Sequence, residues 1–304
     1  MKKILITGAN GFVGNHLSKE LKSASYRLIG LGGEIGSSQK PEGVDEYLVV
    51  DLLDKEKVDK IDFYGVDGII HLAGLAAVGP SFENPMKYID GNVGIEVNLF
   101  EACKKQNIKP KFIIVSSGTI YSPKNVMPLN EQSSILPNSP YAVSKMGQEE
   151  MALYYESIGF EVVIARPFNH IGPGQGLGFI VPDLAKQVID FSTGNTDKIL
   201  VGNLDSERDY TDVRDISRAY RLLFEKGKSG EVYNICSGVA TSGHTILENL
   251  IKIKGIDPKI ELDKSRLRPS DNPLIVGNYD KIRKDTGWQP EISLEQTLID
   301  ILSE

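Results

Sequence analysis

The chain has 304 residues, with 34 basic and 41 acidic side chains, so its formal net charge is −7 at pH 7. This charge excludes a strongly basic nucleic-acid binder. At about 150 residues per domain the length predicts two lobes. The two cysteines, Cys103 and Cys236, lack close spacing such as C-x-x-C, which predicts two buried thiols and no cysteine-built metal site.

The N-terminal segment places an apolar run directly after Lys3, without the small-residue cleavage site of a signal peptide. No later stretch reaches the roughly 18 apolar residues of a membrane-spanning helix. We therefore expect a cytoplasmic protein with no membrane partner and no nucleic-acid partner.

Short β-branched runs alternate with segments of helical period, a pattern typical of βαβ units. Their nearly uniform apolar character indicates a parallel sheet covered by helices on both faces. This predicts an α/β fold with a Rossmann-type, doubly wound sheet. The predicted strands cover residues 3–7, 27–31, 47–50, 68–72, 112–116 and 161–165, and the longest helices cover 85–105 and 140–157.

Beyond residue 165 a glycine-rich loop over residues 168–178 leads into shorter, more mixed elements. We expect a first lobe of residues 1–165 and a smaller second lobe of residues 166–304, with some elements of the second lobe returning to the first sheet. The later helices are predicted over 212–226, 245–254, 280–286 and 294–303, and the later strands over 199–201 and 231–235.

A glycine-rich turn joins the first strand to the first helix, with glycines at positions 8, 11 and 14. Such glycines allow a tight turn and a close approach of the backbone to a pyrophosphate, while the helix N-terminus offers unpaired amides to the anion. The alternative is an ordinary glycine turn. The predicted cofactor-binding residues of this turn are Gly8, Gly11, Phe12, Val13 and Gly14.

The spacing G-x-x-G-x-x-G resembles the extended short-chain dehydrogenase/reductase family. The resemblance implies that Asp51 bonds the adenine amino group and that the loop after His71 lies along the cofactor phosphates. For Asp51 the alternative is a helix N-cap, and His71 is interpreted as structural. The further cofactor-binding residues implied in this way are Asp51, Leu52, Leu72, Ala73 and Gly74.

Cofactor preference depends on the end of the second strand, which reads Leu31-Gly32-Gly33-Glu34. A member that prefers NAD carries an acidic residue there. Gly32 leaves room for a 2′-phosphate, which Ser37, Ser38 or Lys40 could bind, whereas Glu34 could still serve a ribose. We expect NADP(H) as the preferred cofactor and NAD(H) as the alternative.

Tyr141 and Lys145 lie four residues apart on the predicted helix over 140–157, so they share one face. A nearby ammonium lowers a tyrosine pKa, which would suit Tyr141 as a general acid. An exposed helix pair is the alternative. The family resemblance implies that these are the catalytic pair and that Lys145 and Tyr141 also contact the cofactor.

Counting back from Tyr121, Ser117 matches the family's catalytic Ser/Thr, which holds the substrate oxygen, and Thr119 is the reserve candidate. Ser122-Pro123 stands where the family usually has glycine. Dehydratases of this family carry a carboxylate beside the Ser/Thr, but Gly118 and Thr119 occupy those positions. Dehydration is therefore disfavoured.

Three polar residues of the second lobe, Asn169, Arg208 and Arg268, match family positions that contact a nucleotide sugar, and Lys186 could also reach the nucleotide. Arginine suits pyrophosphate because its planar charged fork matches paired oxygens. For the arginines the alternative is a surface ion pair, and for the lysine a solvated helix face. The predicted substrate-binding residues are Ser117, Thr119, Tyr141, Asn169, Lys186, Arg208 and Arg268.

Within the family the chain is most similar to reductases of GDP-4-keto-6-deoxy-D-mannose, which implies NADPH-dependent reduction of the C4 ketone to GDP-D-rhamnose. The alternatives are an NAD-dependent nucleotide-sugar 4-epimerase, a reductase of the opposite face giving a 6-deoxytalose nucleotide, and a cofactor-sensing binding protein. The family also implies a homodimer through the helix that carries Tyr141, to which Met146 and Met151 could contribute.

Overall fold

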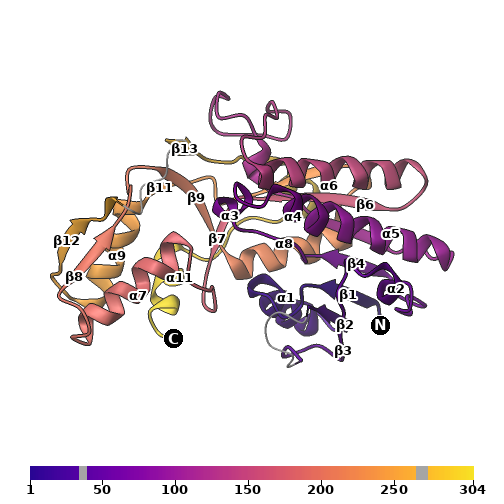
Figure 1. Cartoon of the computed structure of the whole chain (residues 1–304), viewed down its shortest axis with the longest axis horizontal. Helices are drawn as coiled ribbons and strands as arrows, with labels where there is room; N and C mark the ends of the chain where they lie inside the picture. The colour runs from indigo at the N-terminus through magenta and orange to yellow at the C-terminus, as the bar shows by residue number, and fades with distance from the viewer. Residues whose placement is uncertain (34–39, 265–272) are drawn as a thin grey trace.

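The computed structural model describes residues 1–33, 40–264 and 273–304. The chain forms a larger body that contains the N-terminus and a smaller lobe beside it (Figure 1). The larger body is an α/β structure with a doubly wound parallel sheet. The predicted Rossmann-type fold class is therefore confirmed.

Seven parallel strands form the central sheet. The six strands predicted before residue 166 are all present, with ends shifted by at most two residues. From edge to edge the order is β10 (Val232–Ile235), β6 (Val162–Pro167), β5 (Lys111–Val115), β4 (Gly68–His71), β1 (Lys3–Thr7), β2 (Arg27–Gly32) and β3 (Glu46–Val49).

Helices cover both faces of this sheet because successive strand residues point to opposite sides. In β1, Leu5 faces one core while Ile4 and Ile6 face the other. The first core holds stacked aromatic rings, with Phe100 and Phe112 centroids 3.9 Å apart. On the Leu5 side lie α2 (Lys55–Val58), α5 (Ile95–Lys105) and α6 (Pro140–Ser157), and on the other side α1 (Phe12–Ser23), α8 (Val213–Lys226) and α10 (Asp280–Thr286).

The expectation of one regular helix over residues 85–105 is wrong. The segment divides into α4 (Pro85–Ile89), a π-helical turn over Asp90–Gly94, and α5. Asn92 in this turn accepts a hydrogen bond from the Leu75 amide at 2.7 Å and donates to the Ser144 hydroxyl at 2.8 Å. A π-helical turn adds only one residue to the helical period, so it hardly changes the apolar pattern of the sequence. Tertiary hydrogen bonds stabilise the turn.

Elements from the second half of the sequence return to the central sheet. β10 pairs in parallel with β6, and α8 packs on the face that α1 also covers. The lobe boundary expected at residue 165 lies inside β6, which continues to Pro167. The chain therefore leaves the sheet, builds part of the smaller lobe and then comes back.

The smaller lobe packs three helices against short strands around a separate apolar core. The predicted helix over 245–254 begins earlier, at Gly243, because the Ser242 hydroxyl caps it by accepting from the Thr245 amide. The elements of this lobe are β7 (Asn169–Ile171), α7 (Ile180–Ser192), β8 (Lys198–Val201), β9 (Glu207–Asp212), β11 (Ala240–Ser242), α9 (Gly243–Lys254), β12 (Lys259–Leu262), β13 (Leu274–Ile275) and α11 (Leu294–Ile301). The short helix α3 (Val78–Ser81) packs against α6 of the larger body.

Both cysteines, Cys103 and Cys236, are buried free thiols, as the sequence predicted. Among the residues that the structure describes, no helix has the length and apolar character needed to cross a bilayer. The same residues contain no cluster of three or more His, Cys, Asp or Glu side chains that could hold a metal ion.

Substitution of Gly14 tests how tightly the first turn is packed. A Cβ at Gly14 would lie 2.2 Å from the Gly8 carbonyl oxygen, whereas a Cβ at Gly79 would meet nothing within 4 Å. We expect Gly14→Ala to lower the free energy of unfolding by about 1–3 kcal/mol, measured by urea denaturation. Gly79→Ala is the matched control, and equal stability of the two variants would contradict this packing.

Candidate active site

The turn between β1 and α1 has the form of a phosphate cradle. Gly8 adopts a positive φ of +68°, and a Cβ there would lie 3.0 Å from the Ala73 amide nitrogen. Gly11 precedes α1 without any side-chain cap, so the first amides of the helix are available to an anion. Glycine is thus required at both ends of the turn, Gly8 and Gly14, and the residues present fit a dinucleotide pyrophosphate.

The loop after β4 is tied to this turn through Thr7. Its hydroxyl accepts a hydrogen bond from the Ala73 amide at 3.0 Å and lies 2.8 Å from His71 Nδ1. Burial, together with the charge of Lys145, lowers the pKa of His71 to about 3. The ring is neutral at physiological pH, which agrees with the structural role predicted for His71. Leu72, Ala73 and Gly74 therefore border the cradle.

Asp51 lies just after β3 and accepts a hydrogen bond from the Leu53 amide at 3.0 Å. It does not cap the next helix, because Asp54 accepts from the amides of Glu56 and Lys57 and so caps α2. The N-cap alternative for Asp51 is therefore wrong. The exposed carboxylate remains a candidate for the adenine contact, while the side chain of Leu52 is buried in the core.

Ser117 and Tyr141 come together at the C-terminal end of β5. Ser117 caps a short 3₁₀ turn, and its hydroxyl oxygen accepts from the Thr119 amide at 3.2 Å and from the Thr119 hydroxyl at 3.0 Å. Ser139 caps α6 and so presents Tyr141 in the first turn. The Ser117 side chain lies close enough to Tyr141 to lower its pKa. The structure thus brings together the predicted acid and the predicted substrate-orienting hydroxyl.

The expected pKa of Tyr141 is the part of this prediction that is wrong. Burial raises the pKa of Tyr141 above its usual value, and the hydrogen bond from Ser117 opposes the rise. The Lys145 ammonium does not lower it, because its Nζ points to the Val115 carbonyl oxygen and to Gln148 Oε1, both at 2.8 Å. Helical spacing predicted a shared face correctly but could not show which partners the ammonium takes.

Lys145 is 7% exposed and lies beside two buried acids, Glu96 and Glu149. Burial raises the pKa of Glu96 well above its usual value, while Gln148 and the charge of Lys145 oppose this rise. Burial lowers the pKa of Lys145 to about 8, while Glu96 and Glu149 oppose this shift. Gln148 connects Lys145 to Glu96. Its Nε2 donates to Glu96 Oε2 at 3.1 Å, and its Oε1 accepts from Lys145. Glu96 on α5 was not predicted, because only the packing of α5 against α6 places it beside Lys145.

The second acid belongs to a buried polar network behind the site. Glu149 forms a two-pronged ion pair with Arg166 at 2.8 and 2.6 Å. Arg166 also donates to the Tyr121 hydroxyl, which donates to Asn234 Oδ1 at 2.7 Å. The spacing of Tyr141, Lys145 and Glu149 at four-residue intervals is the sequence signal that could have predicted this acid.

The predicted substrate-binding residues Asn169, Lys186 and Arg208 belong to the smaller lobe. Asn169 is exposed at the start of β7. The neighbouring His170 ring stacks on Phe12 of α1, with centroids 6.2 Å apart and planes 7° apart. This contact brings the glycine-rich loop of the smaller lobe against the phosphate cradle, so a ligand bound between them would touch both lobes.

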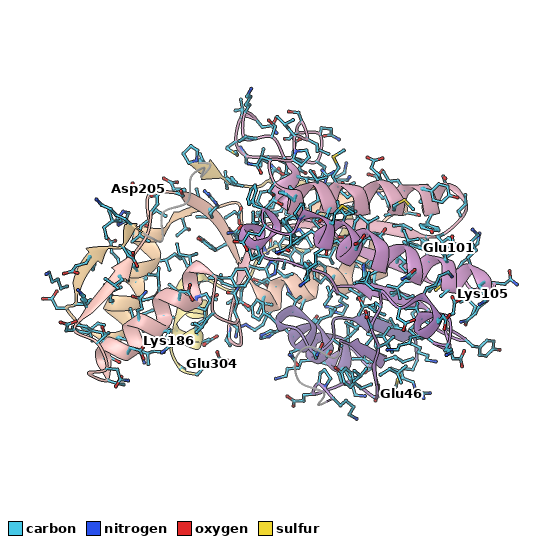
Figure 2. All side chains as sticks on the ribbon, viewed as in Figure 1. Glu46, Glu101, Lys105, Lys186, Asp205 and Glu304 are labelled. Carbon is cyan, nitrogen blue, oxygen red and sulfur yellow. The ribbon has the colours of Figure 1, made fainter. Side chains whose placement is uncertain are left out.

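The remaining predicted substrate contacts have different surroundings. Lys186 lies on α7 in the smaller lobe (Figure 2) and forms an ion pair with Asp190 at 2.7 Å, the solvated-helix alternative. Arg208 on β9 donates to the Glu207 carbonyl oxygen at 2.8 Å. Arg268, like Glu34, Ser37 and Ser38, lies outside the described residues.

Comparison with known proteins agrees with this site. The family model described as GDP-mannose 4,6 dehydratase matches residues 5–301. The GDP-6-deoxy-D-mannose reductase of Pseudomonas aeruginosa is 32% identical over 309 residues, covering 100% of this chain and 97% of the relative. The fold and the site thus define an NAD(P)-dependent oxidoreductase of the extended short-chain dehydrogenase/reductase class. The chain belongs to the GDP-mannose 4,6 dehydratase family, which confirms the resemblance seen in the sequence.

Two solved structures illustrate the range of similar proteins. RMD from Pseudomonas aeruginosa, complexed with NADPH, is 32% identical with a TM-score of 0.87, covering 100% of this chain and 98% of its own. UDP-glucose 4-epimerase from Thermotoga maritima, with UDP-glucose, is 28% identical with a TM-score of 0.89, covering 99% of this chain and 97% of its own. The fold is therefore shared by reductases and epimerases.

The charge of Glu96 is expected to support the charge of Lys145. Glu96→Gln keeps a hydrogen-bond acceptor for Gln148 but removes the negative charge that favours the ammonium. We expect the Lys145 pKa to fall by roughly one unit, so that the ammonium deprotonates at lower pH. The titration can be followed by NMR of isotope-labelled lysine, with the signal assigned by Lys145→Met.

Glu101→Gln is the matched control, because it is the same substitution on α5 at a residue bonded to Tyr155 and Lys104 instead. Its Lys145 titration should equal that of the unmodified protein. An unchanged Lys145 pKa in Glu96→Gln would show that this carboxyl carries no charge beside Lys145.

Proposed function

We propose that the protein reduces the C4 ketone of a nucleotide-linked 4-keto-6-deoxy sugar with NADPH, the substrate being GDP-4-keto-6-deoxy-D-mannose and the product GDP-D-rhamnose. The observation that carries this proposal is that Ser117 and Tyr141 lie close together at the C-terminal end of β5. Lys145 follows one helical turn further along α6. The similarity to the Pseudomonas aeruginosa reductase supports the choice of substrate.

In this mechanism the cofactor, when bound in the Gly8–Gly14 cradle, supplies the hydride. Ser117 donates a hydrogen bond to the C4 oxygen and holds it beside Tyr141. Tyr141 gives its phenolic proton to that oxygen as the carbonyl becomes an alcohol, and the proton is replaced from solvent. The raised pKa of Tyr141 keeps the phenol protonated before the reaction, as a general acid requires. Lys145, one helical turn from Tyr141 on α6, is proposed to contact the cofactor.

Gly118 and Thr119 argue against sugar dehydration as the reaction. Elimination of water from a sugar needs a group that removes a carbon-bound proton and an acid that protonates the leaving hydroxyl. Neither residue beside Ser117 has a carboxyl group, and the Thr119 hydroxyl is already bonded to Ser117. The residues of this chain therefore suit reduction at C4.

Three groups are proposed to hold the nucleotide sugar. Asn169 on β7 and Arg208 on β9 belong to neighbouring parallel strands, so both can face the same ligand from the smaller lobe. Arg268 is proposed to add a second cation for the pyrophosphate, and Lys186 has a weaker claim because Asp190 already neutralises it.

A 4-epimerase that retains NAD is the second candidate, favoured by the structural similarity to the Thermotoga maritima enzyme. The same Tyr141 and Ser117 would then move a proton to and from the C4 oxygen in both directions. Gly32 at the end of β2 counts against it, because a side-chain acceptor for the NAD ribose is missing there.

The first test follows NADPH absorbance with purified protein and freshly prepared GDP-4-keto-6-deoxy-D-mannose. We expect loss of NADPH equal to the sugar added, and a decrease in kcat of at least about 100-fold in Tyr141→Phe, because the general acid is removed. NMR of the product identifies the C4 configuration and so separates GDP-D-rhamnose from a 6-deoxytalose nucleotide. Consumption of neither NADPH nor NADH, with NAD released on denaturation, would favour the epimerase.

We also propose a homodimer formed through the outer face of α6. Val143, Met146 and Tyr154 are 46%, 36% and 50% exposed, and their spacing puts them on one side of the helix. Phe82 and Met86 extend this apolar face and are also exposed. Met151, expected to contribute, packs against the core of the larger body instead.

Charge at the centre of this face should prevent association. We expect light scattering at micromolar concentration to give twice the mass of one chain, and Val143→Lys to shift it to the mass of one chain because a buried lysine is unfavourable at an interface. Val239→Lys, at a 61% exposed valine on the other lobe, is the matched control. A single-chain mass for the unmodified protein would contradict the homodimer.

A further inference from the structure

The space at the end of β2, where the sequence lacks an acidic residue, is filled by another part of the chain. A Cβ built on Gly32 would lie 1.9 Å from the Tyr47 hydroxyl oxygen and 3.0 Å from Cγ of Asn10 in the phosphate turn. The Tyr47 hydroxyl thus occupies the position where a side chain of residue 32 would begin. The room that Gly32 was expected to leave for a 2′-phosphate is in part taken up by this hydroxyl.

Register and glycine together place the Tyr47 ring. β3 pairs Tyr47 with Gly30 of β2, and a Cβ on Gly30 would lie 3.1 Å from Tyr47 Cδ2. The ring therefore runs along β2 from Gly30 to Gly32, over two residues without side chains. Any larger residue at either position would displace it, so the two glycines and the tyrosine act as one unit.

The Tyr47 hydroxyl, which lies at the end of β2, has no hydrogen-bond partner among the residues that the structure describes. Tyr47 Oη is buried and makes no hydrogen bond, an arrangement that costs stability unless a ligand supplies an acceptor. Burial raises the pKa of Tyr47, so the group is a neutral O–H donor at physiological pH. The two acidic residues just before it, Asp45 and Glu46, are paired with Lys22 and Arg27, and Glu46 lies in the larger body, away from the smaller lobe (Figure 2).

Resting on the proposed function, we propose that the Tyr47 hydroxyl donates a hydrogen bond to the 2′-phosphate of NADP(H) and so favours NADP(H) over NAD(H). A phosphate offers acceptor oxygens only, which match a donor, whereas a carboxylate at this place would repel it. In a dinucleotide-binding sheet the ribose that carries this phosphate lies at the end of the second strand. The Asn10 carboxamide beside Gly32 provides a second polar group at the same place.

The test is direct cofactor binding to Tyr47→Phe, which keeps the ring packing and removes only the hydroxyl. Calorimetric titration without sugar should give a Kd for NADPH raised about tenfold, the effect of one hydrogen bond to a charged group. The Kd for NADH should change less than twofold. Tyr26→Phe is the matched control. Tyr26 lies just before the start of β2, at the end opposite Gly32, and its hydroxyl donates to Glu225. Its removal should change the Kd of neither cofactor.

Gly32→Ala provides a second variant, because its methyl group would overlap the hydroxyl and displace it. Gly32→Ala should also weaken the binding of NADPH more than the binding of NADH. Unchanged NADPH binding in Tyr47→Phe, or equal weakening of both cofactors, would overturn the proposal. The binding experiment contains no sugar, so it remains valid even if the protein does not reduce the proposed ketone. If the unmodified protein binds neither NADPH nor NADH, both the role of Tyr47 and the proposed reduction are overturned.

Discussion

The buried Lys145 ammonium is the constraint on which the arrangement of the active site depends. A cation removed from water must be surrounded by acceptors and compensated by negative charge. Here the acceptors come from the end of β5, through the Val115 carbonyl, and from α6 itself, through Gln148. Glu96 on α5 and Glu149 on α6 favour the charged form of Lys145. These requirements fix α5, α6 and β5 relative to one another, and the position of Tyr141 follows from them.

The same constraint connects the site to the smaller lobe. Glu149 balances Arg166 at the end of β6, and Arg166 reaches Tyr121 and Asn234. Asn234 lies on β10, the strand that returns to the sheet after part of the smaller lobe has been built. A fully bonded buried network of this kind tolerates few alternative arrangements. The hydroxyls of the active site and the chain that carries the substrate residues therefore share one rigid support.

Close packing against the backbone is the second recurring feature. It explains why glycine is needed at two positions beside the predicted cofactor site. Gly14 lets α1 approach the Gly8 carbonyl, and Gly32 lets the Tyr47 hydroxyl lie against β2. The missing side chain at Gly14 leaves room for the helix α1, and the missing side chain at Gly32 leaves room for a side chain from the neighbouring strand β3. Both sites border the same predicted cofactor, one at its pyrophosphate and one at its adenosine ribose.

Local pattern in the sequence was sufficient for the sheet strands, the glycine turn and the face shared by Tyr141 and Lys145, because these depend on residues close together in the chain. The π-helical turn at Asn92, the bond from Lys145 to the Val115 carbonyl and the packing of Tyr47 on Gly32 depend on contacts between residues 15 to 52 positions apart. The sequence by itself thus determined the fold class and pointed to the candidate catalytic residues. Only the tertiary structure decided the charge environment of Lys145 and the packing of Tyr47 against Gly32. Burial and distant partners set pKa values and occupy space, and spacing along the sequence records neither.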